Sequence, residues 1–360
     1  MTTSNTRQNK FMGIAEMLIE RLERGDYALR KLPSEMELAE ETGVSRMTAR
    51  RALKHLIDEG FIRRDPNQRP EVACPGGGGR VHQFAFLMPP VISEDVQAWQ
   101  WAAEGAVATI QGVLRPIIYT DWNDVLFSGA LKGFDGVFLM QAGVEVPEAA
   151  ITALKKSPNP VVALDLDLSS LGIPSISLFP EKAVVRLLEH LRKLGHRRIA
   201  CFHTCEMNRV FRQRIEAWEN WKRKSGIEGD LFNFPGRAES IDYGAIQAEK
   251  ECGRLLDSGQ LRDTAVLCTN VWTALGVNRA IQQRGLVVGR DISTCAVNDE
   301  MLAPWMNPSL TSLRMPDPSS MLLSCARWMA GGGGKWEGAK LLVPRQVPLF
   351  KGDSTGAPQI

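Results

Sequence analysis

The chain has no long apolar run, and its first residues do not resemble an export signal. None of its segments approaches the roughly 18–20 consecutive apolar residues that a membrane helix needs. The stretch MTTSNTRQNKFMGIAEMLIERLERGD lacks the apolar core and the small-residue cleavage site of a secretory signal peptide. We therefore expect no membrane span, no secretion signal and a cytoplasmic location.

The residues and motifs on which metal, redox and hydrolytic chemistry depend are also sparse. The seven cysteines are scattered without a CxxC pair, which argues against a zinc site and favours reduced thiols. The five histidines include no HExxH motif. The sequence also lacks a GxGxxG after its first strand-like run and a GxxxxGK[ST]. We expect no metal, no cofactor and no enzymatic activity.

The basic residues that are present are unevenly distributed. The formal net charge of the 360 residues is only +2. Residues 45–64 nevertheless hold an excess of positive side chains over Asp58 and Glu59: Arg46, Arg50, Arg51, Lys54, Arg63 and Arg64. Such a local excess is typical of a surface that contacts a polyanion.

One segment divides the chain into parts with different periodicities. Residues 65–80, DPNQRPEVACPGGGGR, cannot continue a helix or a central strand. Only helical patterns precede this segment, whereas strand-like runs alternate with amphipathic helices after it. The runs are QFAFLMPP, RPIIYTD, DGVFLM, PVVALDLD, RRIACFH, TAVLCTN and DISTCAV. This alternation predicts a multidomain α/β protein, with a small helical domain followed by two doubly wound lobes.

The first part contains two capped helices around a tight turn. Ser34 and Glu37 have the spacing of a capping box, and Gly43 can end that helix in a left-handed conformation. Ser45 then caps a second helix with one apolar stripe, made by Ala49, Ala52, Leu53, Leu56 and Ile57. The opposite face and first turn carry Arg46, Met47, Arg50, Arg51 and Lys54. This pattern suits a helix that enters a major groove, although a basic face can also be merely solvated.

The stretch LPSEMELAEETGVSRMTARRALKHLIDEGFI resembles the winged helix-turn-helix domain of the gluconate-repressor (GntR) family, over roughly residues 10–73. The resemblance implies that the start of the second helix and the wing contact operator DNA. Together with the basic face, it gives a set of candidate DNA-binding residues: Ser34, Ser45, Arg46, Met47, Thr48, Arg50, Arg51, Lys54, Arg63 and Arg64. Residues 66–68 are the expected tip of the wing.

From GHRRIACFH to NPSLTSLRMP the sequence is similar to the effector domain of the lactose/galactose-repressor (LacI/GalR) family, which is related to periplasmic sugar-binding proteins. The resemblance implies two Rossmann-like lobes that are joined by three crossovers and hold a small molecule between them. Matched to the family's positions, the candidate effector-binding residues are Asp165, Arg214, Asn270, Asn298 and its neighbour Asp299. Asn298 stands where the family usually has an aspartate.

Three tryptophans are further candidates, because an aromatic face can stack on the apolar side of a sugar ring. They are Trp99, Trp101 and Trp272, although at least one of the first two is expected to serve packing or dimer contact. Asn270 and Asn298 could alternatively serve only as helix caps, and Arg214 could form a structural ion pair.

The expected domains are a DNA-binding domain (1–73), a linker (74–81), a ligand-binding domain (82–350) and a tail (351–360). The first lobe is predicted at about 82–178 and 309–335, and the second at about 179–308 and 336–350. The expected function is that of a homodimeric transcriptional regulator, more often a repressor, whose partners are double-stranded operator DNA and a carbohydrate effector. The alternative is a regulator whose second domain only dimerises or binds a protein partner.

Overall fold

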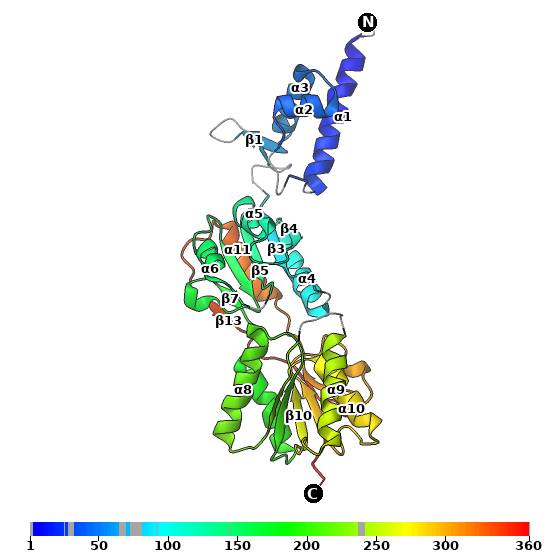
Figure 1. Cartoon of the computed structure of the whole chain (residues 1–360). Coiled ribbons are helices and arrows are strands. Elements are labelled where there is room, and N and C mark those ends of the chain that lie inside the picture. The colour runs from blue at the N-terminus through cyan, green and yellow to red at the C-terminus, as the bar shows by residue number, and fades with distance from the viewer. Residues whose placement is uncertain are drawn as a thin grey trace.

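The computed structural model describes residues 3–24, 26–27, 32–64, 70–72, 81–91, 93–143, 145–236 and 242–359, which form a helical head and two α/β lobes (Figure 1). The head contains α1 (Thr3–Arg24), α2 (Glu35–Thr42), α3 (Arg46–Asp58), β1 (Ile62–Arg64) and β2 (Pro70–Val72). Strands β1 and β2 pair antiparallel as the expected wing. The predicted wing tip and most of the linker lie outside the described residues.

The head has its own apolar core, which confirms the amphipathic patterns in its sequence. Leu18 of α1, Leu38 of α2 and Leu56 of α3 are all completely buried against one another's helices. Ile62 of β1 closes the same cluster. The head therefore packs around side chains that come only from residues before 73.

The first lobe is built on a six-stranded parallel sheet in the order β13-β7-β6-β5-β3-β4. Its strands are β3 (Gln83–Met88), β4 (Val113–Ile118), β5 (Gly136–Met140), β6 (Val161–Leu164), β7 (Ser175–Ile176) and β13 (Leu341–Leu342). Its helices are α4 (Glu94–Thr109), α5 (Val125–Gly133), α6 (Glu148–Lys155), α11 (Ser319–Ala330) and the short 3₁₀ helix η1 (Ser169–Leu171).

The second lobe repeats this plan with the strand order β14-β12-β11-β10-β8-β9, in which only β14 runs antiparallel to its neighbour. Its strands are β8 (Ile199–His203), β9 (Leu231–Asn233), β10 (Ala265–Cys268), β11 (Ser293–Ala296), β12 (Thr311–Leu313) and β14 (Leu349–Phe350). Its helices are α7 (Glu181–Lys193), α8 (Arg209–Ser225), α9 (Tyr243–Asp257), α10 (Val271–Gln283) and the 3₁₀ helix η2 (Ala303–Trp305).

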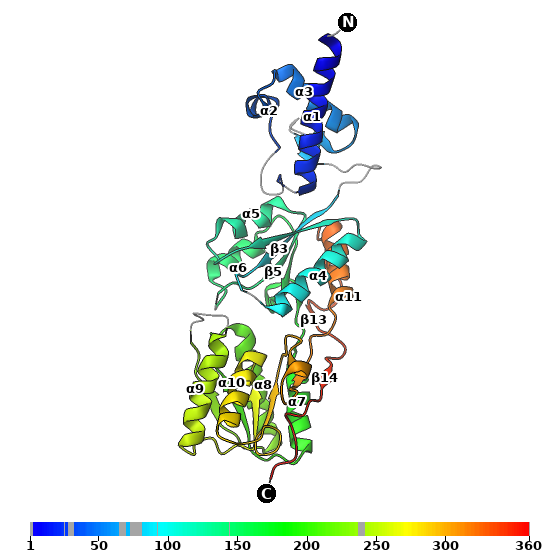
Figure 2. The same ribbon diagram turned by 90° about the vertical axis from the view of Figure 1, so that its right-hand side faces the viewer.

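All seven strand-like runs of the sequence are strands, and the two-lobed α/β fold is confirmed. The central strands β5, β6, β8 and β10 are buried at every position, because helices cover both faces of each sheet. Figure 2 shows the head beyond one end of the first lobe and the second lobe beyond the other. Each sheet has two apolar clusters, one on either face.

The chain crosses between the lobes three times, as expected, but two crossings fall elsewhere than predicted. Residues 309–313 belong to the second lobe, because β12 pairs with β11 and Leu313 is buried in that lobe's core. Residues 336–342 belong to the first lobe, because β13 pairs with β7. The corrected crossings are residues 314–318 and 343–348. These short strands lack an apolar run long enough to be seen in the sequence.

Residues 351–359 are not a free tail, which corrects a second expectation. Ser354 is completely buried, and its backbone N–H donates to the Ser309 carbonyl at 2.9 Å. The Ser354 hydroxyl donates to the Thr294 carbonyl at 2.6 Å and accepts from the Thr311 N–H at 2.8 Å. The Gly356 carbonyl lies 2.9 Å from Nε2 of the buried His196. The end of the chain is thus part of the second lobe.

Helices α9 and α10 approach so closely that one residue between them must be glycine. A Cβ atom built on Gly276 of α10 would lie 2.1 Å from the Ala245 carbonyl oxygen and 2.7 Å from the Ala248 Cβ. Backbone atoms cannot move aside as a flexible side chain can. The contact fixes the position of α10, whose first turn faces the other lobe.

We expect Gly276→Ala to lower the free energy of unfolding by about 1–3 kcal/mol, because the added methyl forces the two helices apart. Urea denaturation followed by tryptophan fluorescence measures this change. Gly105→Ala is the matched control: this helical glycine has open space around it. The control substitution should raise stability by about 0.5–1 kcal/mol. Equal effects at both positions would contradict the close approach of α9 and α10.

Candidate functional site

Helix α3 presents a basic surface because its apolar face is buried against the head. Capping residues at the ends of α2 and at the start of α3 hold the two helices in place. Ser34 and Glu37 form the predicted capping box of α2, and Gly43 ends that helix with φ +64°. The Ser45 hydroxyl accepts from the Thr48 N–H at 3.3 Å and starts α3. Ser34, Ser45 and Thr48 therefore fix the two helices relative to the turn between them.

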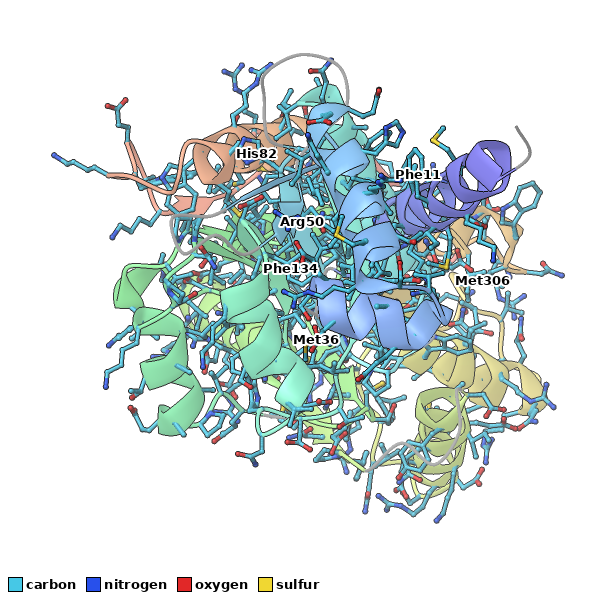
Figure 3. The ribbon with its side chains drawn as sticks, turned by 90° about the horizontal axis from the view of Figure 1, so that it is seen from above. Phe11, Met36, Arg50, His82, Phe134 and Met306 are labelled. Atoms are coloured by element: carbon cyan, nitrogen blue, oxygen red, sulfur yellow. The ribbon has the colours of Figure 1, made fainter. Side chains whose placement is uncertain are left out.

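Five of the predicted DNA-binding residues of α3 lie on its exposed side: Met47 and the basic residues Arg46, Arg50, Arg51 and Lys54. The Nε atoms of Arg46 and Arg50 lie 3.4 and 3.8 Å from Glu35 carboxylate oxygens, with 70% and 65% of the arginine side chains exposed. Exposed pairs of this kind are weak, so both guanidinium groups stay available to another anion. Figure 3 looks down on this end of the molecule, where Met36 and Arg50 lie.

Arg63 and Arg64 belong to β1 of the wing, and the register pairs Arg63 with Glu71 and Arg64 with Pro70. Their side chains lie outside the described part of the chain, as does the predicted wing tip. The structure thus places the backbone of the wing beside α3, and the contacts of these two arginines stay predictions.

A second candidate site lies where the carboxyl ends of the two sheets face each other. Both sheets have the strand order 2-1-3-4-5 of doubly wound folds, in which ligands bind beyond the carboxyl ends of the strands. Asp165 follows β6 of the first lobe directly, and Asn298 follows β11 of the second by two residues. Asn270 comes at the N-terminus of α10, just after β10.

Asp165 is half-buried, and its carboxylate has two hydrogen-bond donors. Its oxygens accept from the Trp99 indole N–H at 2.8 Å and from the Leu178 N–H at 3.3 Å. Burial raises the pKa of Asp165, while these hydrogen bonds and the charge of Arg214 oppose the rise. Its backbone has a positive φ of 49°, unusual for aspartate and typical of functional sites.

Arg214 enters the same region from α8 of the other lobe and is almost completely buried. Its Nη1 donates to the Thr269 carbonyl at 2.6 Å, and its guanidinium lies 5.5 and 5.4 Å from the Phe179 and Phe211 ring centroids. Its Nε is buried and has no hydrogen-bond partner among the described residues. Burial lowers the pKa of Arg214, while Asp165 and Asp95 raise it.

Asp95, a residue that the sequence did not single out, links the two lobes. It lies in the first turn of α4, and the Asn298 amide N–H donates to its carboxylate. Burial raises the pKa of Asp95 to about 6, against the hydrogen bond from Asn298, which lowers it. An acidic residue in a helix's first turn ordinarily offsets the helix dipole, so the sequence carried no signal for this role.

Glu300 is the second group that sequence reasoning missed. It is half-buried, and burial together with the charge of Asp95 raises its pKa to about 7. A hydrogen bond from the Trp272 side chain opposes this rise, which places the predicted Trp272 at the cleft. The nearness of Glu300 to Asn298 and Asp299 in the sequence was the only hint of this role.

The remaining predicted effector residues have structural partners. Asn270 caps α10, with its Oδ1 accepting from the Thr273 N–H at 2.9 Å and its Nδ2 donating to Cys205 Sγ at 3.1 Å. Asp299 accepts from the Ser312 hydroxyl at 2.8 Å inside the second lobe. Trp99 lies on the buried face of α4 and is completely buried, whereas Trp101 of the same helix is 62% exposed. The structure therefore joins Trp99 to Asp165 by a hydrogen bond and places Arg214, Asn298, Asp299 and Trp272 near Asp95 or Glu300, whereas Trp101 is exposed.

A cavity of about 300 Å³ opens beside these charges, with Asp165, Arg214, Phe179 and Val343 in its lining. Its size is at the lower end of the range for small-molecule sites. A larger hollow of about 680 Å³ lies beside Trp328 and Trp336 on the first lobe, but its charged lining residues, Lys335 and Glu337, are exposed. We take the first cavity as the candidate site because Asp165 and the buried Arg214 both line it, although Asp95, Asn298, Glu300 and Trp272 do not.

Within the described residues, no group of three or more histidine, cysteine, aspartate or glutamate side chains has the arrangement of a metal site. In the same ranges, no helix is both long and apolar enough to cross a membrane. The six cysteines that the structure describes are all free thiols.

Comparison with known proteins identifies both parts of the chain. Residues 12–72 match the family model of the bacterial regulatory proteins of the gntR family, and residues 188–329 match a periplasmic binding protein-like domain. The catabolite control protein A of Priestia megaterium is 27% identical over 51% of this chain and 54% of its own length. The lactose operon repressor of Escherichia coli strain K12 is 28% identical over 57% of this chain and 55% of its own.

The chain thus spans just over half the length of the curated relatives it matches. Among solved structures, the lac repressor dimer bound to operator and an anti-inducer has a TM-score of 0.64 at 21% identity, covering 78% of this chain and 96% of its own. A LacI family regulator from Enterococcus faecium with bound ribose has a TM-score of 0.61 at 19% identity, covering 77% and 100%. The chain therefore carries a GntR-type helix-turn-helix domain and a periplasmic-binding-protein-like domain related to LacI-family regulators. Both are families of regulators and binding proteins rather than of enzymes.

We expect Asn298→Ala to shift the two lobes towards an open arrangement, because it removes a hydrogen bond to a half-buried carboxylate worth about 1.5–3 kcal/mol. Small-angle X-ray scattering of the full chain measures the accompanying increase in radius of gyration. The control is Glu145→Gln, which removes the charge of an exposed pair between the lobes, with Arg212 at 3.2 Å. Exposed pairs contribute less than about 1 kcal/mol, so the control should leave the scattering unchanged. An identical profile for both variants would show that Asn298 does not hold the lobes together.

Proposed function

We propose that this chain is a transcriptional regulator that binds operator DNA through α3 and its wing and responds to a small molecule bound between its lobes. The single observation that carries this proposal is the exposed basic face of α3. Arg46, Arg50, Arg51 and Lys54 lie on the side opposite the buried residues Ala49, Leu53 and Leu56, in a helix whose N-terminus is capped by Ser45. An arginine in such a position can bind guanine with two hydrogen bonds or neutralise a phosphate.

The proposal includes a homodimer and a near-palindromic operator. Solved relatives of the second part are described as dimers, one of them bound to operator. This chain exposes large apolar side chains on the second lobe, with Trp305 at 86% and Met301 at 67% exposure. Two heads that are held by such a pair of lobes would contact half-sites related by the protein's two-fold axis. DNA as the partner also implies a cytoplasmic location.

A small-molecule effector, a sugar or sugar derivative, explains the composition of the cleft better than dimerisation alone. A buried arginine and carboxylate between two lobes are a weak source of stability, because both charges have to be removed from water. They are well suited to a polar ligand whose hydroxyls can donate and accept. A solved structure with similar fold holds ribose. The alternative, a second domain that binds only a protein partner, gives these buried charges no role.

Regulation follows from the way in which the cleft joins the lobes. Asp95 and Asn298 connect the first helix of one lobe to a strand end of the other, so a ligand between them would change how firmly the lobes are closed. The first lobe lies next to the head, so a change in lobe closure within a dimer would alter the spacing of the two α3 helices (Figure 1). We propose repression as the basal activity, with the effector changing operator affinity.

We expect Arg50→Ala to weaken binding to a duplex selected from a randomised pool by the wild-type chain, by about 1–3 kcal/mol if a base contact is lost. Fluorescence anisotropy at fixed salt measures the affinity, and repetition at several salt concentrations separates base contacts from phosphate contacts. Arg223→Ala, at an exposed arginine in the last turn of α8, is the matched control and should bind as the wild type does. Failure of the wild-type chain to select any duplex would reject the proposed function.

We expect Arg214→Lys to abolish the response to whichever carbohydrate stabilises the wild-type chain, because lysine cannot reproduce the planar guanidinium between Phe179 and Phe211. In a thermal-shift screen a ligand at 100 times its Kd adds about 2.7 kcal/mol to the stability of the wild type. Arg212→Lys, on the exposed side of the same helix, is the control and should keep the shift. If the ligand still raised the melting temperature of the Arg214 variant, the effector would bind elsewhere. Unchanged operator affinity of this variant would show that its head is intact.

A further inference from the structure

Two methionines of the head are exposed to water although they are apolar. Among the described residues of the head, Met36 and Met47 are the most exposed large apolar side chains, each at 60%. Neither belongs to the apolar cluster that holds α1, α2 and α3 together. The fold therefore does not depend on burying them, and both are available for contact with another molecule.

Both methionines stand at the start of a helix, and one carboxylate connects the two helices there. Met36 is the second residue of α2, and Met47 is the second residue of α3. The carboxylate of Glu35, the residue before Met36, lies 3.4 Å from Arg46 Nε and 3.8 Å from Arg50 Nε. Figure 3 shows this end of the molecule from above, with Met36 and Arg50 labelled. The two methionines therefore belong to the same end of the head as the basic face of α3.

Met47 lies within the row of basic side chains on α3. Residues three and four apart are neighbours on a helix surface, with about 5–6 Å between their Cβ atoms, so Met47 is next to both Arg50 and Arg51. All three side chains are exposed. An uncharged side chain at this position interrupts a face that otherwise carries positive charge. A duplex that binds these arginines must therefore also meet the methionine.

The chemistry of methionine limits what it can recognise on DNA. Its side chain has no charge, and its sulfur is only a weak hydrogen-bond acceptor, so it cannot neutralise a phosphate. The base edges of the major groove offer one apolar group, the 5-methyl group of thymine. The three rotatable bonds of methionine let its thioether follow the surface of such a group.

We propose that Met36 and Met47 determine sequence specificity by packing against thymine 5-methyl groups in the major groove of the operator. This inference rests on the proposed function, in which α3 enters that groove, and adds which base the apolar side chains favour. Base pairs are about 3.4 Å apart along the duplex. The thymine that Met47 contacts therefore lies within about two base pairs of the contact made by Arg50.

The test removes the methyl group and leaves the hydrogen bonds of the base unchanged. In one half-site of the duplex selected by the wild-type chain, each thymine is replaced in turn by uracil, which keeps the O4 acceptor and the pairing with adenine. We expect two positions, one for each methionine, at which uracil weakens binding of the full chain by about fourfold, the loss for one buried methyl group. Fluorescence anisotropy at fixed salt measures these affinities.

Variants assign each thymine to its methionine. Met47→Ala should bind the thymine duplex about as weakly as the wild type binds the uracil duplex, and uracil at the same position should then have no further effect. Met36→Ala should behave in this way at the other position. Met47→Leu keeps an apolar side chain and should retain the preference for thymine. Alanine and leucine are both good helix formers, so these exposed substitutions leave the head folded.

Met12→Ala is the matched control. Met12 lies on α1, is 38% exposed and also stands outside the apolar cluster of the head. This variant should keep the wild-type affinity and both uracil effects.

The salt dependence of binding separates direct contact from an indirect effect on the arginines. A thioether displaces no counterion, so Met36→Ala and Met47→Ala should leave the slope of log affinity against log salt unchanged. A smaller slope in both variants would show that the methionines act by positioning the basic side chains, which contradicts the proposed contact with thymine.

Two further outcomes would overturn the inference. One is equal binding of uracil and thymine at every position, and the other is uracil effects that persist unchanged in both alanine variants. In either case the wild-type chain would still select a duplex and the Arg50 variant would still bind it more weakly, so the proposed function would stand. Failure of the wild-type chain to select any duplex would reject both.

Discussion

Opposite charges lie at least partly removed from water where the carboxyl ends of the two sheets meet, and this is the main physical constraint on the region between the lobes. Arg214 comes from a helix of the second lobe and Asp165 from a strand end of the first, and each influences the pKa of the other. Neither charge is fully exposed to water, so each depends on fixed partners: Thr269 and two aromatic rings for the arginine, Trp99 and Leu178 for the aspartate. A site that holds charges in this way can discriminate between ligands by their polarity, because any change in charge acts in a low-dielectric environment.

The head also depends on arginine side chains, but these are exposed to water whereas Arg214 is buried. Arg46 and Arg50 are mostly exposed and lie loosely near Glu35, so water and salt screen them. Arg46 and Arg50 can leave Glu35 and bind a stronger anion. Arg214 is instead held in one orientation by its partners. In the proposed function, the two environments would separate recognition of a long polyanion from recognition of one small molecule, and the first lobe would couple the two events.

Much of this organisation could be predicted from the sequence, and the failures have physical reasons. Helix caps such as Ser34 and Ser45, the apolar stripe of α3 and the seven long strands depend on local patterns, which a sequence displays. Strands of two or three residues, such as β12 and β13, owe their place to neighbours distant in the chain, so the crossings between lobes were misplaced. Asp95 and Glu300 were missed for the same reason: their importance arises from each other, across more than 200 residues. Trp101 was selected for its aromatic ring and Asp299 as the neighbour of Asn298, but Trp101 is exposed on α4 and Asp299 accepts from Ser312 inside the second lobe.

Each lobe of the second part is assembled from separated stretches of the chain. The first sheet is incomplete without β13 at residues 341–342, and the second requires β14 and the buried Ser354. The head, in contrast, is one continuous stretch with a core of its own. During synthesis on the ribosome, the DNA-contacting module can therefore fold long before the sensor that is proposed to govern it. A nascent or prematurely terminated chain would have a folded head without the two lobes.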